Sequence, residues 1–530
     1  MLKDANTTVA TQPEQQHHAG LRGEAIEPTP AGFESAGLSG AGWLRRICSF
    51  PVMLASLLVG AVFIPAREFR VDPDLWWHLK VGEEILATHH WPTADPYSFT
   101  VHGQPWIAYE WLGEVLWARI YHLGGLRGLE VLSIVLGSAV MVALYACASV
   151  RSRNCKAAFA ACALVFLLAE MSFSLRPQML GYLFLISTLL VLESFRAGRR
   201  WTLWLLPLLF LLWVNTHGTF VIGLGVVLLY WLCGLREFRL GAVQGVAWAA
   251  PDRKRIATVF LLCLAVLPIT PYGARLAAYP FNLAFAQPVN IASILEWQPM
   301  PFNLGVGKLF LALLLGFFLA QVAMRLSWRA EELGLFFAGT VAACLHARFL
   351  LLFVPFFTPL AATVLAKWAP KYELGKDKFA LNAVLAAGVL AAVLFYLPSR
   401  ETLERRVAEH YPVAAVEYLK EHQVAEPMFN SYGFGGYLVC ALAPEHKVFI
   451  DGRADVYERG GVLADYMKIT LLKPGAFGIL SGYHVGSALL DATSPLATVF
   501  SQLPGWKRIY ADEVAVLYER TDAVPVAGRQ

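Results

Sequence analysis

Two aspartates flank a proline at the start of an aromatic stretch, in the segment VDPDLWWHLKVGEEI at residues 71–85. Pro73 fixes its own backbone and disfavours helix at Asp72, whereas Asp74 is free to begin a helix. A carboxylate can take the proton of a hydroxyl group as a general base, so Asp72 and Asp74 are candidate catalytic residues. The structural alternative for Asp74 is the N-cap of the helix that follows.

Further polar side chains stand at the ends of apolar runs. An arginine can bind a phosphate through paired hydrogen bonds while a leaving group gains charge. Carboxylates with separate arginines therefore suit the transfer of a sugar from a lipid phosphate donor. The candidate substrate-binding residues are His78, Arg176 in LRPQ, Asn215 and His217 in NTHG, Glu296 in LEWQP, and Arg348 in HARF.

Each candidate also has a structural interpretation. His78 and His217 can be hydrogen-bonded polar groups, and Glu296 beside Trp297 can anchor the chain at a membrane interface. Arginines at span ends often snorkel toward water. No ligand cluster has the spacing of a metal site, so we assign no metal ligands, and a need for a divalent metal stays open.

The elements that carry these residues are apolar. Of the 530 residues, 57% are hydrophobic and 15% are charged, which predicts a multi-pass membrane protein. The net charge of +4 is small and scattered, so we expect no nucleic-acid partner. Most of the eight cysteines lie in or beside apolar runs, which argues against a disulfide framework.

We predict eleven transmembrane helices, of which the first is a retained signal anchor. One set of short loops carries nineteen Lys and Arg residues and the opposite set carries nine, so the first set is predicted to be cytoplasmic. The predicted spans are 47–66, 128–150, 157–174, 178–195, 201–215, 218–235, 256–270, 306–325, 332–347, 349–366 and 379–397.

Three domains follow from this pattern: a disordered cytoplasmic tail at 1–43, a helical domain at 44–397 with an external loop at 67–127, and a soluble domain at 398–530. Residues 110–125 have helical spacing and suit a helix in the membrane interface or one packed on the rest of the loop. The soluble domain shows an αβ rhythm, with strands expected at 427–430, 447–451 and 514–520 and a glycine turn at 433–438.

An odd number of crossings places the soluble domain outside the cytoplasm. The same count places the candidate residues on that side, because each lies in an external loop or at an external span end. A charge at the centre of a bilayer costs about 2.5–3.5 kcal/mol on insertion scales, so these groups should line a wet cleft or pair with one another. We therefore predict an external pocket, roofed by the first loop and the soluble domain.

The segments DPDLWWHLKVGEEIL, ADPYSFT, EWLGEVL, RPQ, NTHGTFVIG, LEWQP and HARF together resemble bacterial integral membrane proteins of the C-type glycosyltransferase (GT-C) superfamily. The resemblance covers residues 43–400 in plan. It implies a bundle of many helices, a polyprenyl-phosphate sugar as donor, an envelope glycan, lipid or protein as acceptor, and residence in the bacterial inner membrane. It also implies a catalytic acid in the first external loop, a role that falls on Asp72 or Asp74.

The stretch FNSYGFGGYLVCALAPEHKVFIDGRADVY resembles a soluble domain that recurs in one branch of these proteins. Its Asp451, Arg453 and Asp455 are interpreted as structural residues or as substrate contacts. Three functions remain open: a glycosyltransferase, a non-catalytic envelope protein whose bundle anchors the external domain, and a transporter or flippase.

Overall fold

The computed structural model describes residues 40–521 except 70, 172, 286 and 325. The predicted disordered tail therefore lies almost entirely outside the described residues. The chain divides into two compact units, Met1–Ile47 and Cys48–Gln530. In the first unit the described residues form one short helix, α1 (Gly40–Ile47), with Arg45 and Arg46 in its last turn.

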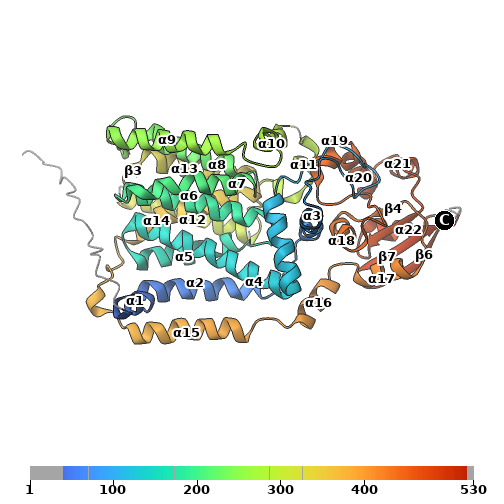
Figure 1. Cartoon of the computed structure of the whole chain (residues 1–530), viewed down its shortest axis with the longest axis horizontal. Coiled ribbons are helices and arrows are strands. Elements are labelled where there is room, and N and C mark those ends of the chain that lie inside the picture. The colour runs from blue at the N-terminus through green and yellow to red at the C-terminus, as the bar shows by residue number, and fades with distance from the viewer. Residues whose placement is uncertain (1–39, 70, 172, 286, 325, 522–530) are drawn as a thin grey trace, which may run out of the picture. The chain divides into compact units, whose positions relative to one another are not determined.

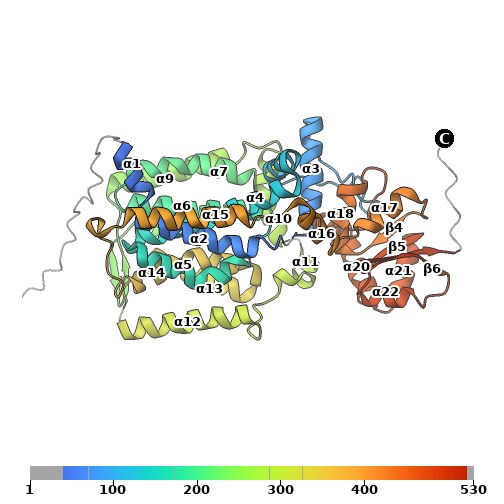
Figure 2. The ribbon, with the colours of Figure 1, turned by 90° about the horizontal axis from the view of Figure 1, so that it is seen from below.

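Apolar helices form most of the second unit up to residue 395, and Figures 1 and 2 show many of them side by side. Small residues permit close packing where α5 meets α14: Ala158, Ala161 and Cys162 are fully buried. The helices are α2 (Phe50–Ala66), α4 (Trp111–Ser152), α5 (Cys155–Glu170), α6 (Gln178–Arg196), α7 (Leu206–Val214), α8 (Phe220–Cys233), α9 (Ala250–Val266), α12 (Gly305–Met324), α13 (Ala330–Leu345), α14 (Leu350–Leu365) and α15 (Phe379–Phe395).

Among the described residues, four helical segments are long and apolar enough to cross a membrane: Trp111–Ser152, Gln178–Arg196, Gly305–Met324 and Ala347–Leu365. The bent pair of α15 and α16 (Arg400–Ala408) would make a fifth. Shorter helices occupy the other predicted spans. The chain is thus a helical membrane protein, and the number of eleven spans stays a prediction.

The first loop is built on two helices that touch along their length. A Cβ atom at Gly82 of α3 (Asp74–Thr88) would lie 2.1 Å from the carbonyl oxygen of Glu114 in α4, so only glycine permits this approach. α4 begins at Trp111 and is interrupted at Gly125, where φ is 58°. Its first part buries Trp117 against α3 and leaves Leu116 and Leu123 exposed, so it packs onto the loop by one face.

Residues beyond 412 form a four-stranded sheet with helices around it. The strand order is β4 (Met428–Asn430), β5 (Ser487–Asp491), β7 (Ala515–Arg520) and β6 (Trp506–Ala511). β4 pairs with β5 in parallel, and the other pairs are antiparallel. The surrounding helices are α17 (Val413–Glu421), α18 (Tyr432–Leu442), α19 (Ala454–Arg459), α20 (Val462–Thr470), α21 (Ala476–Gly482) and α22 (Pro495–Phe500).

Two local predictions in this segment are wrong. The expected glycine turn at 433–438 is part of helix α18, and the expected strand at 447–451 has only an isolated bridge between Val448 and Ser98. Gly436 of α18 permits a close approach to the backbone of Pro73, because a Cβ there would lie 2.4 Å from the Pro73 carbonyl oxygen. The helix therefore sits directly on the start of α3.

The C-terminal segment shares its hydrophobic core with the first loop. Trp77, Tyr97 and Trp106 of the loop belong to the same buried cluster as Phe429 and Phe449. The hydrophobic core of the C-terminal segment thus extends into residues 67–127. Because burial of apolar surface stabilises both parts at once, each holds the other in place.

A buried ion-pair network lies at the end of α6 that is far from Arg176. Arg196 Nη2 is 2.6 Å from Glu331 Oε1, and Arg329 Nη2 is 2.8 Å from Glu193 Oε1. A small sheet adjoins it, with the order β1 (Phe238–Leu240), β2 (Val243–Gly245) and β3 (Trp328–Arg329). These charges tie α6 to the start of α13.

Candidate active site

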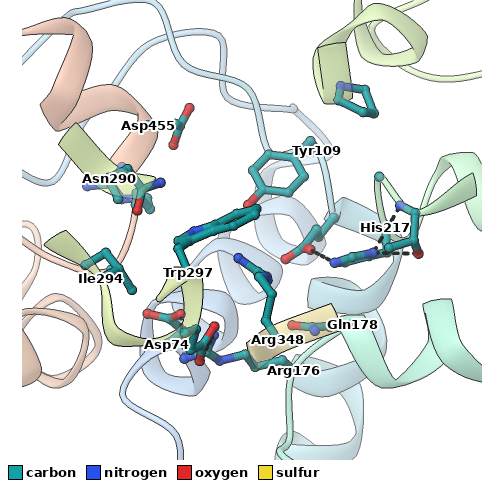
Figure 3. A pocket seen from close by; sticks show the side chains of 18 of the residues that line it. Asp74, Tyr109, Arg176, Gln178, His217, Asn290, Ile294, Trp297, Arg348 and Asp455 are labelled. Atoms are coloured by element: carbon teal, nitrogen blue, oxygen red, sulfur yellow. Dashed lines mark hydrogen bonds and ion pairs between the residues drawn. The ribbon is translucent and has the colours of Figure 1, made fainter. Parts of the chain in front are cut away.

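A cavity of about 520 Å³ lies where the helix bundle meets the first loop and the C-terminal segment (Figure 3). One wall is apolar and comes from the starts of α8 and α14 and from the end of α10 (Ala274–Phe285). The remaining lining is rich in charged and aromatic side chains. The polar and aromatic lining residues include Asp74, Trp77, His78, Tyr109, Glu110, Arg176, Gln178, Tyr182, His217, Thr219, Tyr279, Asn290, Glu296, Trp297, Arg348, Tyr432, Arg453 and Asp455.

Arg176 stands among three carboxylates. Its Nε is 2.6 Å from Asp72 Oδ1, its Nη2 is 3.2 Å from Asp74 Oδ2, and its Nη1 is 3.2 Å from Glu296 Oε1. Three separate parts of the chain supply these acids and the arginine: the start of α3, the turn before α6, and the short helix η2 (Leu295–Trp297). The positive charge of Arg176 is therefore already balanced inside the protein.

Asp74 is the first residue of α3 and lines the cavity, while Asp72 contacts the backbone of Asp74 and does not line the cavity. The N-cap position belongs to Pro73, and Asp72 Oδ1 accepts a hydrogen bond from the Asp74 amide at 2.9 Å. Gly452 of the C-terminal segment covers Asp74 so closely that a Cβ there would lie 1.7 Å from Asp74 Oδ1. Burial raises the pKa of Asp74 to about 7, although Arg176 acts in the opposite direction.

Glu110 forms a second acidic centre with two histidines. Its Oε2 is 3.4 Å from His78 Nε2, and its Oε1 is 3.3 Å from His217 Nε2. His78 Nδ1 lies 3.1 Å from Glu114 Oε1 on the side away from the cavity. Burial raises the pKa of Glu110 to about 8. Burial also lowers the pKa of His217 to about 3 and holds that of His78 well below its usual value, so both imidazoles are neutral near pH 7.

Arg348 is the cavity arginine that keeps its charge available. Its guanidinium carbon lies 4.2 Å from the centre of the Trp297 ring, and among the described residues it makes no ion pair. Figure 3 shows its side chain pointing into the cavity between Trp297 and His217. A guanidinium held this way can bind an anionic group.

The C-terminal segment completes the site. Arg453 Nη1 is 2.6 Å from Asp95 Oδ1 in the first loop, and Arg453 Nη2 is 2.6 Å from Asp451 Oδ2. This fully buried arrangement fixes the turn that carries Gly452 and Asp455 to the cavity. Asp455 Oδ2 accepts a hydrogen bond from the Tyr279 hydroxyl at 2.6 Å, and burial raises the pKa of Asp455.

Of the residues named from the sequence, eight line the cavity: Asp74, His78, Arg176, His217, Glu296, Arg348, Arg453 and Asp455. Asp72 is not among the lining residues and contacts two that are, Arg176 and the amide of Asp74. Asn215 is not among the lining residues, because its amide is engaged by the Trp111 indole at 2.8 Å and by the carbonyls of Leu211 and Ile269. It joins α7 to α4.

Sequence reasoning did not assign a role to Glu110, Tyr109 or Tyr279. The signal for Glu110 was present, since it is an acid directly before an amphipathic helix in the first loop. Tyr279 is contacted by Asp455 from the other end of the chain, and no local pattern indicates such a contact.

The described side chains do not fit a resident metal ion. No group of three or more His, Cys, Asp or Glu side chains in residues 40–521, its four gaps aside, is placed to hold one. The cavity carboxylates face Arg176, imidazoles or Tyr279 instead. We therefore derive no step through a metal.

No protein-family model matches the sequence, and no curated protein sequence matches it. Solved structures do match the fold. ArnT from Cupriavidus metallidurans in the apo state aligns over 90% of this chain and 98% of its own, with 15% identity and a TM-score of 0.50. The Archaeoglobus fulgidus oligosaccharyltransferase tethered to an acceptor peptide aligns over 85% of this chain and 70% of its own, with 12% identity and a TM-score of 0.50. The chain thus has the fold of GT-C glycosyltransferases.

Proposed function

We propose that the chain is a membrane glycosyltransferase that moves a sugar from a polyprenyl-phosphate donor to an envelope acceptor. The observation that carries this proposal is the composition of one cavity. Arg348, which makes no ion pair among the described residues, Asp74, whose pKa is about 7, and an apolar wall line the same space. Such a space can bind an anionic lipid and a hydroxyl acceptor side by side. The GT-C fold is consistent with this chemistry and does not by itself establish it.

Charge and apolarity support one position for the proposed donor. Its phosphate binds Arg348, because Arg176 is already engaged by three acids. Its prenyl chain lies along Val221, Ile222 and Leu352, which belong to the apolar wall. A polar group next to such a wall suits an amphipathic ligand.

The proposed general base is Asp74. Its carboxylate faces the cavity, and its pKa of about 7 permits it to take a proton near neutral pH. Asp72 is less suited, because one of its oxygens is ion-paired with Arg176 and accepts a hydrogen bond from the Asp74 amide, and because the residue is not among those that line the cavity. Asp72 is therefore proposed to hold Arg176 and the start of α3 in position.

The proposed setting is a bacterial inner membrane with eleven spans, a cytoplasmic N-terminus and the site on the extracytoplasmic face. The domains proposed from the sequence, 1–43, 44–397 and 398–530, fit this arrangement. Asp74, Arg176, His217, Glu296 and Arg348 lie at the same end of the bundle as the C-terminal segment, as this topology requires. The acceptor approaches from that segment.

A protein that merely anchors an external domain has no need for the C-terminal segment to supply lining residues to a polar cavity. Arg453 and Asp455 do so here. A transporter or flippase needs a path across the bundle, whereas the helices α8 and α14 line the described cavity with residues near their first turns. The transferase therefore explains more of the arrangement than either alternative.

The test is mass spectrometry of envelope glycans and lipid-linked sugars in cells that lack the protein, complemented with wild type, Asp74→Asn or the exposed control Glu83→Gln. We expect one lipid-linked sugar to accumulate and one glycan to lose a sugar in the absence of the protein. Wild type and Glu83→Gln should restore the profile, and Asp74→Asn should not. An unchanged profile in cells without the protein would favour the anchor.

A further inference from the structure

His78 lies between two carboxylates in a way that fixes the number of protons in the group. One ring nitrogen is 3.1 Å from Glu114 and the other is 3.4 Å from Glu110, and all three side chains are buried. A neutral imidazole carries a single N–H, so it can donate only one of these two contacts. With the N–H of Nδ1 directed at Glu114, the lone pair of Nε2 faces a Glu110 oxygen at 3.4 Å, and this contact is repulsive unless Glu110 carries a hydrogen. We therefore expect Glu110, His78 and Glu114 to hold one proton more than two carboxylates and a neutral imidazole would.

His217 has a defined tautomer that bears on Glu110. The backbone N–H of Thr219 donates to His217 Nδ1 at 3.2 Å, so this nitrogen is an acceptor. The ring proton of neutral His217 is then on Nε2, which points at Glu110 Oε1 from 3.3 Å. The N–H of His217 thus faces one oxygen of Glu110, and the other oxygen, which faces His78, is the one that can carry the proton.

Of the two carboxyl groups, Glu110 is the one that can pass the proton to the cavity. Glu110 lines the cavity, whereas Glu114 does not and is 1% exposed. The charge of Arg348 acts on Glu110, and Figure 3 shows Arg348 and His217 facing the same space. The site proposed for the donor phosphate is therefore beside a carboxyl group that carries a proton.

We propose that Glu110 is a general acid that gives its proton to the phosphate of the lipid carrier, with His78 and Glu114 as the residues that keep it protonated. This inference rests on the proposed function. The bond between the sugar and the phosphate oxygen breaks with its electron pair on that oxygen, which takes the proton from Glu110. The acceptor hydroxyl bonds to the sugar carbon and loses its proton to Asp74. Afterwards Asp74 releases that proton to water, and Glu110 takes one back from water.

This role complements that of Asp74. An arginine at 3.2 Å favours the ionised form of Asp74, whereas the groups in contact with Glu110 are neutral imidazoles. Environments that separate two carboxyl groups in this way assign one as base and the other as acid. The charged or titratable groups that act on Glu110 are Asp74 and His78 of α3, Tyr109, Glu114 of α4, Arg176, His217, Arg348 and Asp455.

The test measures the affinity of the purified full chain in lipid nanodiscs for undecaprenyl phosphate between about pH 8 and 9.5. The second ionisation of a phosphate monoester is near 6, so the ligand stays dianionic in this window. We expect the wild-type Kd to rise about tenfold, because an ionised Glu110 repels the phosphate. The amide of Glu110→Gln neither ionises nor repels, so its Kd should stay level, and the control Glu83→Gln should behave as wild type.

The outcomes separate the two proposals. If the wild type binds and Glu110→Gln loses affinity with the same slope, the acid role is wrong while the proposed function stands. If the wild type binds no undecaprenyl phosphate, both are wrong. Should Glu110→Gln fail to fold, infrared spectra of Asp74→Asn decide: a protonated carboxyl band must be present at pH 7 and fade above about pH 8, and its absence at pH 7 overturns the proposal.

Discussion

At the scale of single residues, the site depends on neighbours that set the protonation of two carboxyl groups. Arg176 stands 3.2 Å from Asp74, and His78 and His217 flank Glu110. Burial raises the pKa of both Asp74 and Glu110. Their different neighbours leave Asp74 suited to accept a proton and Glu110 suited to give one.

This difference predicts a bell-shaped pH profile for transfer. A base acts when ionised, so kcat/KM should fall below the Asp74 pKa of about 7; an acid acts when protonated, so it should also fall above the Glu110 pKa of about 8. Measurement of kcat/KM from pH 5 to 10 in wild type and Glu110→Gln checks this. An alkaline limb that survives in Glu110→Gln would contradict the assignment.

Gly452 is predicted to control the position of Asp74. A methyl group there would sit 1.7 Å from Asp74 Oδ1, so Gly452→Ala must displace the carboxylate or the turn. Because a misplacement of about 1 Å can cost a hundredfold in rate, we expect a loss of about that size in kcat. Gly478→Ala in α21 is the matched control, since nothing lies within 4 Å of its Cβ. Equal activity of the two variants would show that Gly452 has no such role.

At the scale of elements, the C-terminal segment and the first loop act as one body. Arg453 joins them through Asp95 and Asp451 and lies 4.8 Å from the Trp106 ring. The turn at 451–455 reaches the cavity because this arginine is held on both sides. Residues that lie far apart in the sequence thereby form one wall of the site.

Arg453→Met is predicted to destabilise this junction by about 3–5 kcal/mol, because it leaves the buried carboxylates of Asp95 and Asp451 without a counter-charge. Thermal unfolding and limited proteolysis of the purified protein measure the loss, and Arg508→Met, on the exposed face of β6, is the control. Unfolding temperatures that match between the two variants would mean that the ion pairs contribute little.

The sequence predicts some of the residues that line the site and misses others. Span ends place Asp74, Arg176, Glu296 and Arg348 together because topology alone decides which side of a membrane they face. The same pattern marks Asn215, whose amide in fact hydrogen-bonds within the bundle. It could not assign Glu110 or Tyr279, because their roles arise from contacts among the first loop, α10 and the C-terminal segment that no periodicity reports.

At the scale of the whole molecule, the helical domain and the C-terminal segment are predicted to depend on each other. In a chain that ends at Arg400, the side chains of Trp77, Tyr97 and Trp106 would lose the residues of the C-terminal segment that bury them and would become exposed. We expect such a chain to insert into membranes, to lose protection of residues 72–110 from protease, and to bind no undecaprenyl phosphate. Binding equal to that of the full chain would show that the segment is dispensable for the site.

The most direct measurement follows donor consumption by the purified protein in proteoliposomes supplied with the total lipid-linked sugars and glycans of its source cells. We predict that wild type consumes one lipid-linked sugar and releases an equal amount of undecaprenyl phosphate, as counted by mass spectrometry, while Asp74→Asn releases almost none. No release by wild type, or equal release by Asp74→Asn, would contradict the assignment of this cavity as a glycosyl-transfer site.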